Sequence, residues 1–159
     1  MILVDSILAI NEEALELSRV PLFSKLDPAR LKLIAFTSDR LNLGEQEYLF
    51  FHDDPSDSVY LVLDGILQVT VEHDDGSVDV IAELEKNQLV GEMGVIANTP
   101  RTASIRSSGH STVLKIEADT FLSLLTENPS MSLHVMRELT SKLSKTHLQL
   151  VELKEQTSH

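Results

Sequence analysis

The chain has 159 residues, a formal net charge of −12 at pH 7, no cysteine and an apolar fraction of 42%. These values predict one globular domain over residues 1–159, with enough chain to bury a substantial core. The lack of cysteine excludes disulfides and thiolate metal sites and fits a reducing cytoplasm. The negative charge argues against nucleic acid or an anionic membrane as partner, because both would be repelled.

Helices are predicted before residue 40. The first ten residues are apolar but include Asp5 and no basic residue, so they do not fit a signal peptide. Asn11 is a candidate N-cap for the helix-forming run that follows it, and Pro21 ends that run. Asp27-Pro28 predicts a second helix start, because aspartate caps helices and proline is favoured at their first position. No later stretch is long and apolar enough to span a bilayer.

The middle of the chain, residues 41–117, reads as short strands separated by turn signals. Apolar runs with strand character lie at 59–63, 66–71, 78–82, 102–106 and 111–116. Turns are expected at Asp64-Gly65, Asp75-Gly76 and Ser108-Gly109, of which Asp75-Gly76 is the pair that favours a tight hairpin. So many short strands predict a closed or double-sheet antiparallel architecture.

The C-terminal part, residues 118–156, is predicted to be helical. A first helix over 118–125 ends before Asn128-Pro129, and a longer one begins near Ser130. In the longer helix, residues spaced three and four apart form a heptad seam at Met136, Leu139, Leu143, Thr146, Leu150 and Leu153. This seam predicts either packing on the strands of the same chain or a homodimer through Leu139, Leu143, Leu150 and Leu153.

The segment 91–104, Gly-Glu-Met-Gly-Val-Ile-Ala-Asn-Thr-Pro-Arg-Thr-Ala-Ser, is the most informative part of the sequence. It places the carboxylate of Glu92 and the guanidinium of Arg101 on either side of a short turn. A guanidinium suits a phosphodiester because its planar fork donates two parallel hydrogen bonds. A carboxylate is the natural acceptor for a sugar hydroxyl. Gly91 and Gly94 would let the backbone approach a ligand closely. The pattern therefore indicates a ligand with an anion and a sugar.

This segment resembles the phosphate-binding cassette of cyclic nucleotide-binding domains, and the similarity extends from about Val20 to Leu150. The resemblance implies an α+β, mainly β fold. In it an antiparallel jelly-roll-like barrel over 41–117 carries the cassette at 91–104, between N-terminal helices over 1–40 and C-terminal helices over 118–156. It also implies that Glu92 binds the ribose and Arg101 the phosphate. The cassette residues expected at the ligand are Gly91, Glu92, Met93, Arg101, Thr102 and Ala103.

The resemblance further implies contacts to the base. Val69 and Leu84 would line it from the strands, and Lys142 and Thr146 would reach it from the last helix, one turn apart on one face. An ordinary solvent-facing role for those two helix residues is equally open. Thr102 permits either cAMP or cGMP. The chain departs from the family pattern at Asp53-Asp54, where a glycine is common, and aspartate is among the few residues that tolerate a positive φ there. It also departs at Val90, where an aromatic residue is common.

The sequence thus predicts a cytoplasmic, non-catalytic sensor that binds cAMP, or else cGMP, and signals to an effector protein by repositioning its C-terminal helix. No cofactor or metal is expected, because the histidines are scattered. A nucleophile elbow and a phosphate loop ending in Gly-Lys-Ser/Thr are likewise absent from the sequence. The alternative is a protein-interaction domain of the same fold that binds no nucleotide.

Overall fold

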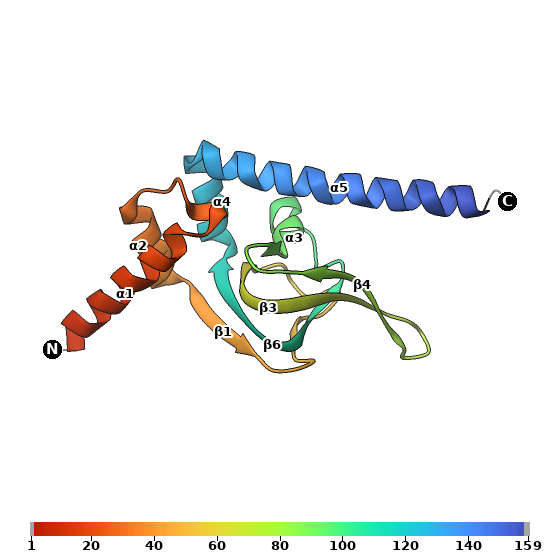
Figure 1. The fold of residues 1–159 in the computed structure, drawn as a ribbon, viewed down its shortest axis with the longest axis horizontal. Coiled ribbons are helices and arrows are strands. Elements are labelled where there is room, and N and C mark those ends of the chain that lie inside the picture. Colours follow the sequence, from red (N-terminus) through yellow and green to blue (C-terminus); the bar gives the residue numbers. More distant parts are fainter. Residues whose placement is uncertain (1, 158–159) are drawn as a thin grey trace.

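The structure is a computed structural model that describes residues 2–157, including the side chains of Val4 and of residues 7–155 (Figure 1). Its elements are α1 (Ile2–Ser18), the 3-10 helix η1 (Pro21–Phe23), α2 (Pro28–Thr37), β1 (Asp39–Leu43), β2 (Tyr48–Phe50), β3 (Ser58–Glu72), β4 (Val78–Leu84), β5 (Leu89–Val90), α3 (Glu92–Ala97), β6 (Ser104–Glu117), α4 (Ala118–Glu127) and α5 (Pro129–Thr157). None of the described helices combines the length and the apolar character needed to cross a membrane.

The N-terminal helices confirm one predicted start and correct the other. Asp27 caps α2 and accepts a hydrogen bond from the backbone N–H of Arg30 at 2.8 Å, with Pro28 at the first helical position. Asn11 lies inside α1, so the predicted N-cap at that residue is wrong. The apolar residues that precede Asn11 contain neither glycine nor proline, and nothing interrupts the helix before it.

The six strands form one antiparallel sheet in the order β1-β6-β3-β4, while β2 also pairs with β6 and β5 with β3. The predicted mainly β fold with flanking helices is therefore confirmed. Strand pairing leaves this sheet open, since no pairing joins β4 to β1 among the described residues. Figure 1 shows the long strands curving beneath α3 and α5, so the sheet wraps without closing.

Two of the three predicted turns, Asp64-Gly65 and Ser108-Gly109, are not turns between strands but bends within continuous strands. β3 runs through Gly65 and β6 through Gly109, both of which have positive φ, 84° and 73°. The register between the two strands shifts around Asp64, so the extra residues form bulges. A Cβ on Gly65 would lie 2.4 Å from the backbone oxygen of His110, which explains why glycine occupies this bend.

The hydrophobic core has two parts, one on each face of the sheet. Successive side chains of β3 point alternately into one part and the other. Val59 and Leu61 point into a cluster with the helices, which includes Phe23, Phe121 and Met131. Their neighbours Tyr60 and Val62 point to the opposite face, into a cluster inside the curved sheet. The inner cluster is completed by Leu43, Leu67, Val90, Ile105 and Val113, with Phe50, Val69 and Leu84 packed against it.

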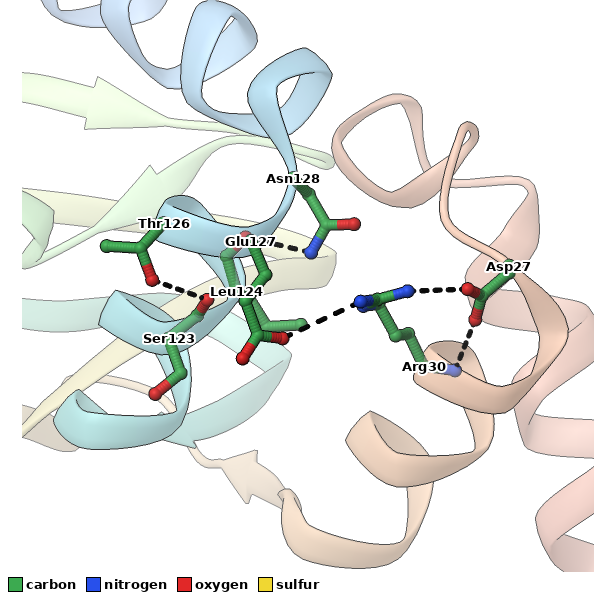
Figure 2. A network of polar contacts seen from close by, with 7 residues as sticks. All are labelled: Asp27, Arg30, Ser123, Leu124, Thr126, Glu127 and Asn128. Atoms are coloured by element: carbon green, nitrogen blue, oxygen red, sulfur yellow. Dashed lines mark hydrogen bonds and ion pairs between the residues drawn. The ribbon is translucent and has the colours of Figure 1, made fainter.

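An ion pair of Arg30 connects α2 with α4 near the start of α5. Figure 2 shows Arg30 of α2 between two carboxylates, with its Nη1 2.6 Å from Asp27 Oδ2 and its Nη2 3.7 Å from Glu127 Oε2 of α4. Asn128 closes α4 by donating from Nδ2 to the Leu124 carbonyl at 2.9 Å (Figure 2). The N-terminal helices therefore contact the junction from which α5 departs.

α5 is buried at its start and exposed further along. Met131 and Val135 lie in the helical core, and Leu139 packs against it. Leu143 and Leu150 are 70% and 61% exposed, so the second half of the seam does not pack on the strands of the same chain. In Figure 1 this half continues past the end of the sheet. The homodimer through the seam stays a prediction.

Candidate functional site

The cassette is a short helix held between two left-handed residues. Gly91 has φ 81° and precedes α3, and Asn98 has φ 55° and follows it. The Thr99 N–H then donates to the Gly94 carbonyl at 3.0 Å, which turns the chain towards Pro100. These two turns place the side chains of residues 92 and 101 in the same region of the molecule.

The loop before β3 fixes the end of the cassette. The backbone N–H of Arg101 donates to the Asp54 carbonyl, and that of Asp53 donates to the Arg101 carbonyl, both at 2.9 Å. Ser56 Oγ donates to the Thr99 carbonyl at 2.6 Å. Asp53 has φ 71°, so the expectation that aspartate tolerates a positive φ in this turn is confirmed.

Arg101 is buried, with 3% of its surface exposed. Its Nη1 donates to the Gly91 carbonyl at 2.9 Å and its Nη2 to the Ser58 carbonyl at 2.6 Å. Its Nε is buried and has no hydrogen-bond partner. Burial lowers the pKa of the guanidinium, and nearby negative charges, including that of Asp57, oppose this shift. Arginine still keeps its charge, so the site holds a buried cation with one nitrogen, Nε, that has no hydrogen-bond partner.

Aromatic rings support this cation. The guanidinium carbon of Arg101 lies 4.1 Å from the centroid of the Phe50 ring and 5.9 Å from that of Tyr60. The site residues predicted from the sequence did not include Phe50, Tyr60 or Ser58. Each belongs to a strand run with no motif of its own, and no local signal connects it with residue 101.

The two cassette glycines make room for atoms of the protein itself. A Cβ on Gly91 would lie 2.3 Å from Arg101 Nη1, and one on Gly94 would lie 2.2 Å from Ser56 Oγ. These glycines are therefore needed for the internal packing of the cassette. Close approach of a ligand to either residue stays a prediction.

Glu92 is as buried as Arg101 and already has a partner. Its exposed fraction is 2%, and its Oε1 lies 2.5 Å from the Nζ of Lys142 on α5. Lys142 Nζ also donates to the Leu89 carbonyl at 3.3 Å. The residue expected at the base thus lies against the carboxylate expected at the ribose.

Glu138 completes this charged group and was not predicted. It lies one turn before Lys142 on α5, and its Oε2 is buried without a hydrogen-bond partner. Burial raises the pKa of the Glu138 carboxyl; the Lys142 charge opposes that rise and the Glu92 charge adds to it. The spacing of four residues on one helix face is the signal that could have revealed it.

The other residues predicted to contact the ligand make no hydrogen bond or ion pair with the side chains of Glu92 or Arg101 in the part of the chain that the structure describes. Val69 and Leu84 pack on the inner cluster, and their contact with a base stays a prediction. Met93 is 52% exposed, Thr102 is exposed and Ala103 is half-buried. Thr146 is exposed, and its hydroxyl donates to the Lys142 carbonyl of its own helix at 3.0 Å.

Other sites are less informative. Two surface hollows of about 230 and 290 Å³ lie between η1 and α5 and between α2 and α4, and neither is lined by a predicted ligand contact. Among the residues that the structure describes, no three His, Asp or Glu side chains gather as a metal site would require.

Comparison with known proteins gives a family and several relatives. A family model described as "Cyclic nucleotide-binding domain" matches residues 40–128, more than half of the chain. An uncharacterized NTE family protein of Mycobacterium bovis is 28% identical over 127 residues, which cover 80% of this chain and 21% of that protein. The chain therefore spans about a fifth of the length of this relative.

Solved structures share the fold. A catabolite activator protein of Thermus thermophilus matches with a TM-score of 0.71 at 25% identity, covering 84% of this chain and 63% of that one. A cAMP-binding acyltransferase of Mycobacterium smegmatis matches with a TM-score of 0.75 at 22% identity, covering 86% and 42%. At that lower identity the second likeness concerns the fold alone.

Proposed function

Because the chain belongs to the cyclic nucleotide-binding domain family, we propose that it binds a cyclic nucleotide, cAMP in preference to cGMP, as a regulatory module. The observation that carries this proposal is the pair of buried ionic side chains, Glu92 and Arg101, at the two ends of one cassette. Burying either charge is costly unless it has a partner. Lys142 pairs with Glu92, and Asp57 Oδ1 lies 3.9 Å from Arg101 Nη2. A ligand with both a phosphate and a ribose would account for having an anion and a cation buried in one cassette.

Arg101 is assigned to the cyclic phosphate. Its Nε donor is free, and its ring contacts with Phe50 and Tyr60 fix the plane of the fork. Glu92 is assigned to the ribose 2′-hydroxyl, and Val69 and Leu84 to the base. Gly91, Met93, Thr102 and Ala103 complete the cassette contacts.

The domain is proposed to be non-catalytic and cytoplasmic, and to act on an effector. The output would pass through α5, whose start packs on the helical core while its second half is exposed. Since the chain spans about a fifth of its NTE family relative, the effector is either a further part of a longer protein or a separate partner.

Isothermal titration calorimetry with cAMP and cGMP tests the proposal, on protein unfolded and refolded to remove any bound nucleotide. We expect saturable binding that Arg101→Ala weakens by roughly 2–5 kcal/mol, the range for removing one partner of a buried charge pair. A loss of less than about tenfold, roughly 1.4 kcal/mol, would contradict the phosphate assignment.

The Lys142 contact favours a second candidate, an interaction domain that binds no nucleotide. In that case the ion pair within the chain is sufficient reason for Glu92 to be present. Absence of heat with both nucleotides, from refolded protein with a normal circular dichroism spectrum, would establish this candidate in place of the first.

A further inference from the structure

Lys142 is ion-paired with Glu92, the carboxylate that the ligand is proposed to use. Its Nζ lies 2.5 Å from Glu92 Oε1 and also donates to the Leu89 carbonyl, so the ammonium is bound to both β5 and the first residue of α3. The bond to Glu92 joins α5 to the cassette, and the bond to the Leu89 carbonyl joins it to β5 just before the cassette. The lysine side chain is 30% exposed, whereas that of Glu92 is 2% exposed.

A ribose hydroxyl at Glu92 would bind the same buried carboxylate as this ammonium. A hydroxyl gains a charge-assisted bond from a buried carboxylate, and so does the lysine. If the ribose displaces Lys142 from Glu92, the ammonium loses an ion pair in a partly buried place. That loss opposes ligand binding unless another acceptor is within reach.

Glu138 is such an acceptor. It precedes Lys142 by four residues on α5, the order and spacing in which glutamate and lysine pair on a helix. Its Oε2 is buried and has no partner, which is costly in the state described here. An ammonium that moved from Glu92 to Glu138 would satisfy this oxygen.

We propose that Lys142 is a two-position residue that competes with the ribose for Glu92, pairing with Glu92 when the site is empty and with Glu138 when nucleotide is bound. This inference rests on the proposed function, since it needs a ribose at Glu92. Lys142 then sets the affinity of the site, and its transfer breaks the bond that joins α5 to Glu92 of the cassette. The assignment differs from the base contact expected from the sequence, in which Lys142 strengthens binding.

Calorimetric titration of cAMP into the wild type and three single variants tests this competition. Lys142→Met keeps the apolar stem and removes the charge, and it should tighten binding about tenfold, the size of one charge-assisted hydrogen bond. Glu138→Gln removes the negative charge of the second position and should weaken binding about twofold. Lys145→Met makes the same charge change on an exposed part of α5 and should leave the affinity unchanged.

The double variant Lys142→Met/Glu138→Gln gives the sharpest result. If Glu138 acts only through Lys142, its substitution has no effect once Lys142 is methionine. Unchanged or weaker binding by Lys142→Met would overturn the competition, and weaker binding would support the base contact instead. If neither the wild type nor Lys142→Met binds cAMP, the proposed function itself is wrong. If only Lys142→Met binds, the competition is supported, and Lys142 blocks the site in the wild type.

Discussion

Arg101 of the cassette lies over the ring of Phe50, the last residue of β2, with the guanidinium carbon 4.1 Å from the ring centroid. The ring contacts a face of the guanidinium that hydrogen bonds do not use, while two carbonyls hold its edge. Phe50 is therefore a positioning residue, because it fixes the plane in which the fork would meet an anion.

Phe50→Leu should weaken nucleotide binding by about 1 kcal/mol, roughly fivefold, because it removes the ring contact and keeps an apolar side chain. Calorimetry measures this, with Phe51→Leu as control, since Phe51 is adjacent and 54% exposed. Equal effects of the two substitutions would refute a specific role for Phe50.

Gly91→Ala should both destabilise the fold and weaken ligand binding. The new Cβ would meet Arg101 Nη1 at 2.3 Å at a residue with φ 81°, for a combined cost of about 2–5 kcal/mol. Gly76→Ala is the matched control, since φ is 85° there and nothing lies within 4 Å; we expect about 1–2 kcal/mol from the backbone alone. Urea denaturation gives both values, and equal losses would show that the Arg101 contact does not matter.

Glu138→Gln should change how stability depends on pH. Because the pKa of this carboxyl is raised on folding from an ordinary value of 4.5, the folded state holds its proton longer than the unfolded state does. The wild type therefore loses stability as the pH rises from about 4.5 through the raised pKa. The glutamine variant lacks this loss and should be the more stable protein at neutral pH, with little difference at pH 4.

Urea denaturation between pH 4 and 8 measures this difference, with Glu152→Gln on the exposed part of α5 as control. Asp27 and Asp75 have pKa values lowered by their hydrogen bonds to Arg30 and Ser77. The contributions of these two carboxylates to the free energy of unfolding are lost only at more acidic pH. They are the same in the variant and the wild type, so they cancel in the comparison. A constant difference across the range would contradict the assigned pKa shift.

Leu143 and Leu150 should mediate dimerisation if the heptad seam pairs two copies of α5. We expect a dimer by light scattering at micromolar concentration and a monomer for Leu143→Glu/Leu150→Glu. Leu15→Glu on α1 is the control, because Leu15 is 60% exposed and lies outside the seam. A wild-type monomer at all concentrations would rule out this contact as a dimer interface.

Local signals in the sequence predicted the elements that local chemistry determines. Asp27-Pro28 and Asn128-Pro129 mark helix boundaries where the structure has them, since a cap or a proline acts within one turn. The cassette was predicted for the same reason, because a glycine, a short helix and a proline follow each other within fourteen residues.

The features that were missed depend on distant parts of the chain. A glycine with positive φ has the same local signature in a hairpin and in a bulge, and the pairing of β3 with β6 decides between them. The contact between Lys142 and Glu92 joins residues 50 positions apart. The family pattern predicted that both lie near the ligand, but whether they bond to it or to each other depends on how α5 packs.

The length of α5 gives the Lys142 contact a mechanical consequence. From Lys142 to Thr157 the helix continues for 15 residues, a rigid arm of about 22 Å at 1.5 Å per residue. A change in the direction of α5 at the cassette would therefore be amplified at the end of this arm. By the reciprocity of coupled equilibria, a partner that held the arm in one orientation would also alter the affinity for nucleotide, without touching the binding site.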